Sequence, residues 1–127
     1  ALSQTFPASL QRLQLVLFRS GVHDGGAVSI ARRLPCSLKK LHLDFGDCDI
    51  RNEGATELSR HLPKALQQLE LNFEHCHITY LGAGSICNVI QSLRELVTLE
   101  LRFLECPIGK ELLHATAMTY PGTLQAL

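Results

Sequence analysis

The sequence has no excess of charge of either sign, since twelve basic and twelve acidic residues give a formal net charge of zero. Proteins that cover a nucleic-acid backbone or an anionic membrane surface usually carry a basic excess. The chain also lacks any apolar run close to the ~20 residues that a membrane-spanning helix needs. Residues 1–7 lack the basic start and apolar stretch of a secretory signal. We therefore expect neither a nucleic-acid partner nor a membrane partner.

A disulfide framework is also missing, because the chain has five cysteines, an odd number. Three of them, Cys48, Cys76 and Cys106, occupy the same position of a repeat, whereas disulfide-bonded cysteines are spaced irregularly and in pairs. The sequence contains no Asn-x-Ser/Thr acceptor for glycosylation. These features favour a reducing intracellular compartment, cytoplasmic or nuclear. Cys36, which follows Pro35 in a predicted loop, is the thiol that we expect to be most reactive.

What the chain does contain is one motif, L-x-x-L-x-L-x-[LF]-x-x-[CS]-x-[IV], in four copies. The copies begin at Leu10, Leu38, Leu66 and Leu96, and a fifth begins at Leu124. Their starts are separated by 28, 28, 30 and 28 residues, and such a fixed period indicates an array of stacked units. The single domain 1–127 therefore divides into repeats at 10–37, 38–65, 66–95 and 96–123, with 1–9 ending a preceding repeat and 124–127 starting a truncated one.

Each repeat combines two periodicities. Leu41, Leu43 and Phe45 alternate with polar residues, and this period of two predicts a strand with one apolar face. Further on, Leu58 and Leu62 are four residues apart, as on one face of a helix. Asn52, and Asp24 in the first repeat, are predicted to cap these helices. Small residues at the helix start are expected to let each helix lie close to the strand layer.

The motif and its period resemble the leucine-rich-repeat family, close to its ribonuclease-inhibitor-like, intracellular branch, over essentially the whole chain. The resemblance implies an α/β fold, a right-handed solenoid with a curved parallel sheet on the concave face and helices on the convex face. The two extra residues of the third repeat are expected in a surface loop near 92–95. Neither end shows a polar capping repeat, so we expect a fragment of a longer array that can self-associate through its uncapped ends.

The resemblance also implies a protein partner on the concave face, where the strand residues that point away from the core are displayed. The candidate partner-binding residues share this outward position, or lie in the turn after a strand: Phe18, His42, Asp44, Asp47, Glu70, Asn72, Glu74, His75, Glu100, Arg102 and Leu104. With Glu105, six of the twelve acids lie on this stripe, so we expect a basic patch on the partner. Glu70 and Glu100 are predicted to face each other on adjacent strands, which is unfavourable without a nearby cation.

Other interpretations stay open at this point. The charges can form an ordinary solvated face, and Phe18 can pack under a preceding repeat. The repeats also resemble those of Ran GTPase-activating proteins, a role that requires a polar or arginine residue on a loop between strand and helix, with Arg51 and Lys110 as the basic candidates. A third interpretation is an architectural spacer in a larger receptor or ubiquitin-ligase adaptor.

We expect no catalytic, cofactor or metal site. The tightest cluster is His75-Cys76-His77, but adjacent strand residues point to opposite faces, and no second metal-binding motif accompanies it. Asp47, His75 and Glu105 can gather on neighbouring repeats, where an ordinary ladder of His and carboxylate side chains is favoured over a metal site. The cysteine column is interpreted as small buried side chains at the bend after each strand.

Overall fold

The computed structural model describes residues 6–108 and 123–125, in which strands and helices alternate along the chain. The strands are β1 (Arg12–Val16), β2 (Lys40–Asp44), β3 (Gln68–Asn72), β4 (Thr98–Arg102) and β5 (Thr123–Gln125). The helices are α1 (Asp24–Arg32), α2 (Asn52–Arg60) and α3 (Tyr80–Ile90). The strand and the helix of each of the first three repeats therefore lie within one copy of the 28- or 30-residue period.

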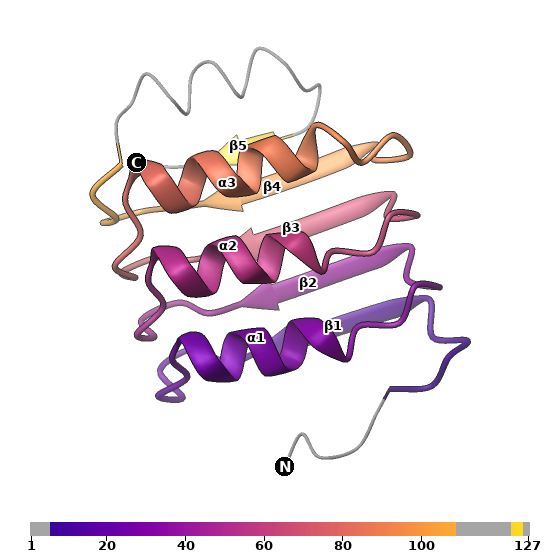
Figure 1. Cartoon of the computed structure of the whole chain (residues 1–127), viewed down its shortest axis with the longest axis horizontal. Helices are drawn as coiled ribbons and strands as arrows, with labels where there is room; N and C mark the ends of the chain where they lie inside the picture. Colours follow the sequence, from indigo (N-terminus) through magenta and orange to yellow (C-terminus); the bar gives the residue numbers. More distant parts are fainter. Residues whose placement is uncertain (1–5, 109–122, 126–127) are drawn as a thin grey trace.

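All five strands belong to one parallel sheet in the order β1-β2-β3-β4-β5. The helices α1, α2 and α3 cover one face of this sheet, and no helix of the described residues lies on the other face (Figure 1). The chain runs along a strand, returns through the helix and rises to the next strand with a right-handed turn (Figure 1), the hand that parallel connections almost always take. The predicted α/β solenoid is confirmed. We call the side without helices the open sheet face; it is the face expected to be concave.

Leucine columns form the core because the strand register matches the repeat. Leu41 of β2 pairs with Leu69 of β3, and Leu69 pairs with Leu99 of β4. All three side chains are buried. Burial of one such side chain contributes about 1.5–3 kcal/mol, and each strand supplies its next apolar residue to the same interior. A single repeat cannot enclose these side chains alone, so its neighbours complete the core.

A stack of phenylalanines continues the core beyond the strands. The ring centroids of Phe45 and Phe73 are 5.8 Å apart with their planes inclined by 17°. Phe73 and Phe103 repeat the arrangement at 5.9 Å and 14°. The three rings are almost fully buried, and Leu17 occupies the same motif position in the first repeat. The stack ties the second, third and fourth repeats into one unit.

The turn after each strand has the same backbone in all four copies. Cys48 N–H donates to the Phe45 carbonyl oxygen at 3.2 Å and closes the turn of the second repeat. The residue before this position has a left-handed conformation in every repeat, with φ between 54° and 62°: Arg19, Asp47, His75 and Glu105. A non-glycine residue rarely adopts this conformation, so its recurrence marks a bend that the stacked repeats enforce.

The predicted helix caps are wrong, because Asp24 and Asn52 bond to the following repeat instead of their own helix. The residues before them, His23 and Arg51, occupy the cap positions and make no side-chain cap hydrogen bond. The Asp24 carboxylate accepts a hydrogen bond from Arg51 N–H at 2.8 Å. The Asn52 side-chain oxygen accepts from Thr79 N–H at 2.9 Å and from Gly82 N–H at 3.0 Å. These polar contacts join successive helix starts.

Glycine near the helix start serves this inter-repeat contact. A Cβ atom at Gly54 would lie 2.2 Å from an Asp24 carboxylate oxygen, and one at Gly82 would lie 2.6 Å from the Asn52 oxygen. We expected small residues here because the helix lies close to the strand layer. The atoms nearest to these glycines, however, belong to the helix start of the preceding repeat.

The two extra residues of the third repeat lie in a helix, not in the expected loop. α3 has 11 residues, whereas α1 and α2 have nine each. Seven residues separate the end of each helix from the next strand in all three cases. The insertion thus lengthens α3, where two more residues gain helical hydrogen bonds, and Leu93 becomes buried just after it.

Some predictions fall outside the described residues. They concern Lys110 and the rest of the fourth repeat at 109–122, together with residues 1–5 and 126–127 of the two ends that were assigned to neighbouring repeats. In the part of the chain that the structure describes, none of the helices has the length and apolar character required to cross a bilayer.

Two glycines of α3 provide a matched test of the inter-repeat contact. We predict that Gly82→Ala destabilises the protein by about 1–3 kcal/mol, because the new methyl group overlaps Asn52. Gly84→Ala in the same helix meets no atom within 4 Å and should stabilise it by about 0.5–1 kcal/mol through helix propensity. Urea unfolding measures both values, and equal effects of the two substitutions would contradict the assignment of Asn52 to this contact.

Candidate functional site

The strands β1 to β4 place the candidate residues on the open sheet face in rows. Adjacent strands pair residue by residue, so His42 of β2 lies beside Glu70 of β3, and Glu70 lies beside Glu100 of β4. The next row along the strands contains Asp44, Asn72 and, on β4, Arg102. Because alternate side chains of a strand point to opposite faces, these rows share the face opposite the leucine core.

Six of the eleven candidate residues line one shallow hollow of about 120 Å³. The hollow lies over β2, β3 and β4, and its floor includes Leu71. The six are His42, Asp44, Glu70, Asn72, Glu100 and Arg102. Phe18, Asp47, Glu74, His75 and Leu104 are not among its lining residues.

Two acidic side chains face each other at the centre of the hollow. Glu70 and Glu100 are paired across β3 and β4, as predicted. His42 Nδ1 lies 3.5 Å from a carboxylate oxygen of Glu70, and Arg102 Nε lies 3.0 Å from a carboxylate oxygen of Glu100. The Glu100 side chain is only 23% exposed, so its charge is poorly hydrated. Repulsion between the two carboxylates is unfavourable; His42 lies beside Glu70 on β2, and Arg102 follows Glu100 two residues later on β4.

Asp44 and Asn72 stabilise the carboxyl ends of the neighbouring strands β2 and β3, a role that the sequence pattern did not reveal. The Asp44 carboxylate accepts hydrogen bonds from Gly46 N–H at 2.8 Å and from the Asn72 amide at 3.0 Å. The Asn72 side-chain oxygen accepts from Glu74 N–H at 2.9 Å, and Asn72 is 9% exposed. These bonds fix the bend after the strand, so the two residues form the wall of the hollow with little freedom to turn towards a partner.

Asp47 and His75 occupy the left-handed position in the turns after β2 and β3, respectively. Both are exposed, and Asp47 forms an ion pair of 2.8 Å with Arg19 of the preceding repeat. Glu74 lies one residue before His75 and is half-buried. Among the described residues, no group of three or more His, Cys, Asp or Glu side chains has an arrangement that can hold a metal ion.

The apolar candidates lie at the two ends of the array. Phe18 is 46% exposed, and its ring lies under the Arg19 guanidinium at 5.2 Å. A Cβ atom at Gly46 would lie within 2.7 Å of this ring, so the glycine lets the ring lie over the second repeat. Neighbouring Val16 is 57% exposed, whereas Leu104 is half-buried. Phe18 and Val16 together expose apolar surface beside the charged rows.

A second hollow of about 260 Å³ adjoins the first towards the starts of the strands. It shares His42 and Glu70 with the first hollow and adds Arg12, Lys40 and Gln68. The open sheet face is therefore acidic in its centre and basic where β1 and β2 begin. Arg12 and Lys40 are paired across β1 and β2. They point outward by the same alternation as His42, so the sequence pattern also identifies them as residues of the open sheet face.

The cysteine column is buried, and each thiol has a partner in the preceding repeat. Cys48, Cys76 and Cys106 donate to the carbonyl oxygens of Leu17, Phe45 and Phe73 at 3.1, 3.2 and 2.9 Å. The interpretation as small buried side chains is confirmed for Cys48 and Cys76, which are 5% and 2% exposed, while Cys106 is half-buried. Burial raises the pKa of Cys76 to about 12 and also raises the pKa of Cys106, because the thiolate loses its hydration.

Arg51, the candidate for a GTPase-activating role, lies at the start of α2. Its Nε is 3.3 Å from Asp49, and its side chain is 65% exposed. The backbone N–H of Arg51 bonds to Asp24, so its main chain is fixed by the preceding repeat.

Thiol reactivity tests the environment of the cysteines. At about pH 8, a thiol with a pKa of about 12 is ionised to roughly one part in ten thousand. We therefore predict that iodoacetamide modifies exposed Cys36 in the folded protein and leaves Cys76 unmodified. Mass spectrometry of peptides reports both sites, and unfolding in urea should make Cys76 react. Equal modification of Cys36 and Cys76 in the folded protein would refute the buried assignment.

Comparisons with known proteins agree with this geometry. A family model described as Leucine Rich repeat matches residues 36–59 and 69–87. A solved structure named Leiomodin-1 Actin-Binding Site 2 is similar, with a TM-score of 0.67 and 18% sequence identity over 90% of this chain and 69% of that chain. Identity at this level shows a shared fold alone. No curated protein sequence matches the chain.

Proposed function

We propose that this chain, which carries leucine-rich repeats, is a non-catalytic protein-interaction module that binds a basic segment of a partner through its open sheet face. The pair of Glu70 and Glu100 is the observation that carries this proposal. Two carboxylates on adjacent strands repel each other, and a cation between them would relieve the repulsion. A lysine or arginine side chain of a partner supplies such a cation.

The size of the hollow favours recognition of a side chain over a small molecule. Pockets for cofactors and drug-sized ligands usually enclose about 300–1,000 Å³. The hollow over β2 to β4 has about 120 Å³, enough for the charged end of one basic side chain. Its open form and mixed polar lining also suit a segment that lies across the strands.

Phe18 and Val16 supply apolar contact area beside the charged rows. Exposed aromatic residues in such a position often contribute strongly to binding. Phe18 is already held against Gly46 and under Arg19, so little side-chain freedom is lost on binding. A partner that places an apolar residue here and a basic residue over Glu70 and Glu100 would contact both features.

Protein recognition also fits the solved structure of similar fold, which is named as an actin-binding site. That name belongs to the other protein. The similarity supports the proposal that this fold serves as a protein-binding surface. The kind of partner is inferred from the charges of the open sheet face alone.

A model ligand tests the proposed acidic site. We expect a short fluorescein-labelled peptide of alternating lysine and serine to bind at low salt, and Glu70→Gln/Glu100→Gln to weaken the binding about tenfold, which corresponds to about 1.4 kcal/mol. Fluorescence anisotropy measures the affinity. The matched control is Glu53→Gln/Glu95→Gln, which removes two exposed acids away from the open sheet face and should change the affinity less than about twofold.

Equal losses in the two double variants would reduce the effect to net charge and refute the assigned site. Because Gln keeps the shape of Glu, we expect all variants to fold, and circular dichroism of each variant verifies this.

A further inference from the structure

The solenoid separates its charges between two edges although its net charge is zero. At the edge where helices end and strands begin, residues 6–12, 32–40, 60–68 and 90–98 carry eight bases and one acid, Glu95. We call this the basic edge; its bases are Arg12, Arg32, Arg33, Lys39, Lys40, Arg60, Lys64 and Arg94. At the opposite edge, residues 16–25, 44–53, 72–81 and 102–108 carry seven acids and three bases.

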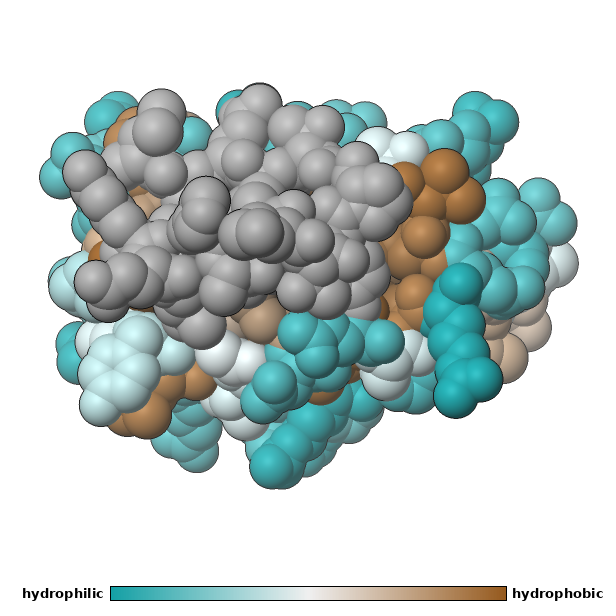
Figure 2. Space-filling view, turned by 90° about the horizontal axis from the view of Figure 1, so that it is seen from above, coloured by the Kyte–Doolittle hydropathy of each residue, from teal (hydrophilic) through white to brown (hydrophobic). Residues whose placement is uncertain are grey.

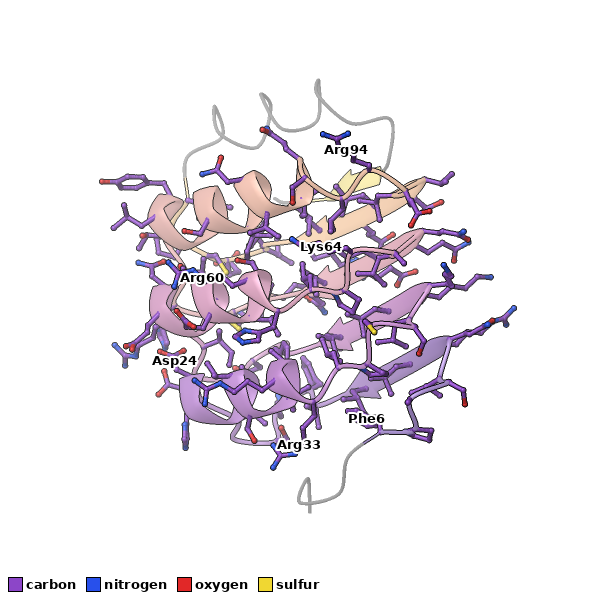
Figure 3. The ribbon with its side chains drawn as sticks, turned by 45° about the vertical axis from the view of Figure 1, so that its right-hand side comes forward. Phe6, Asp24, Arg33, Arg60, Lys64 and Arg94 are labelled. Atoms are coloured by element: carbon purple, nitrogen blue, oxygen red, sulfur yellow. The ribbon has the colours of Figure 1, made fainter. Side chains whose placement is uncertain are left out.

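The two edges differ in how far their charges are neutralised. The three arginines of the acidic edge, Arg19, Arg51 and Arg102, all form ion pairs. On the basic edge, Arg60 pairs with Glu57, and Arg33 donates to Ser29. Within the described residues, the other six bases of the basic edge form no ion pair. Figure 3 shows Arg33, Lys64 and Arg94 one above another along this side of the molecule.

Helix dipoles explain only part of this charge. Bases in the last turn of a helix are favoured by its partial negative charge, and this effect falls off beyond that turn. Arg32 and Arg60 are last-turn residues of α1 and α2, whereas α3 has no base in its last turn. Lys39, Lys64 and Arg94 lie beyond the helices. Their alignment therefore needs another explanation.

An apolar side chain is exposed on the same edge. Val97 is 70% exposed, and its backbone N–H donates to the Gln67 carbonyl oxygen at 2.8 Å, which fixes its position. Seen from above, hydrophobic surface adjoins hydrophilic side chains on the right-hand side, where the helices end and the strands begin (Figure 2). The edge thus combines cations with an apolar contact.

We infer that the basic edge binds an acidic polypeptide segment with interspersed apolar residues, at a surface around Lys64, Arg94 and Val97, none of which lines the hollow around Glu70 or the one that adjoins it. The cations match its carboxylates, and Val97 matches an apolar side chain between them. A nucleic acid fits less well, because bases stack on exposed aromatic rings. Phe18 and Tyr80, the large aromatics that the described chain exposes, both lie at the opposite edge.

A second copy of this chain is also a poor occupant. Four acids of its acidic edge already have partners: Asp47 and Asp49 form ion pairs, and Asp24 and Asp44 accept backbone hydrogen bonds. The acidic edge therefore offers few free carboxylates to the unpaired bases of another molecule.

The test uses the full chain and a fluorescein-labelled peptide of four Glu-Glu-Leu units. We expect binding that weakens as salt is added, and a loss on the order of tenfold in Lys64→Glu/Arg94→Glu, because both exposed charges are reversed. Val97→Ser should weaken binding several-fold. The control Arg19→Glu/Arg51→Glu changes the net charge equally at the opposite edge and should retain the affinity within about twofold.

Each outcome decides the inference once circular dichroism shows that the variants are folded. Equal losses in the edge and control variants overturn it, as does unchanged binding in Lys64→Glu/Arg94→Glu. Tighter binding of a single-stranded oligothymidine of equal charge would assign the edge to nucleic acid instead and also overturn it. Glu70→Gln/Glu100→Gln should leave this peptide bound, so failure of the proposed acidic site and failure of the basic edge are distinguishable.

Discussion

Stacking of identical motif positions across neighbouring repeats is the constraint on which the rest of the structure depends. Phe45, Phe73 and Phe103 form a column of nearly parallel rings, and the leucines before them form columns in the strand register. No repeat can bury its apolar side alone, so stability comes from each interface between neighbours. The polar contacts of Asp24 and Asn52 with the next helix start follow the same spacing. A shift of register by one residue would expose every leucine column.

The same stacking determines the surface that we propose for binding, because each outward-facing residue lies beside its counterpart in the next repeat. It brings Glu70 against Glu100 at the centre of the open sheet face and aligns the bases where the helices end. A neutral sequence thus gives a molecule with separated charges. Two features that are unfavourable for the isolated fold, a carboxylate pair and a row of unpaired cations, are the ones that a charged partner would stabilise.

The alternation of leucines and the repeat period were sufficient to predict the fold, its strands and the facing of Glu70 and Glu100. They could not assign Asp24 and Asn52, because an Asp or Asn at a helix start has the same pattern whether it bonds to its own helix or to the next repeat. The insertion in the third repeat could equally extend a loop or a helix by its sequence; in the structure it lengthens α3, and Ile90 and Leu93 are buried. The net charge of zero did not predict the basic edge, because net charge does not report where the charged residues lie in the fold. The structural roles of Asp44 and Asn72 depend on side-chain hydrogen bonds that spacing alone does not specify.

Contacts between the phenylalanine rings test the stacked register most directly. With phenylalanine rings selectively labelled for NMR, nuclear Overhauser effects should join Phe45 to Phe73 and Phe73 to Phe103, whose centroids are 5.8 and 5.9 Å apart. No effect should join Phe45 to Phe103, because the middle repeat separates them. Direct contact between Phe45 and Phe103, or loss of both neighbouring contacts in the folded protein, would contradict the account.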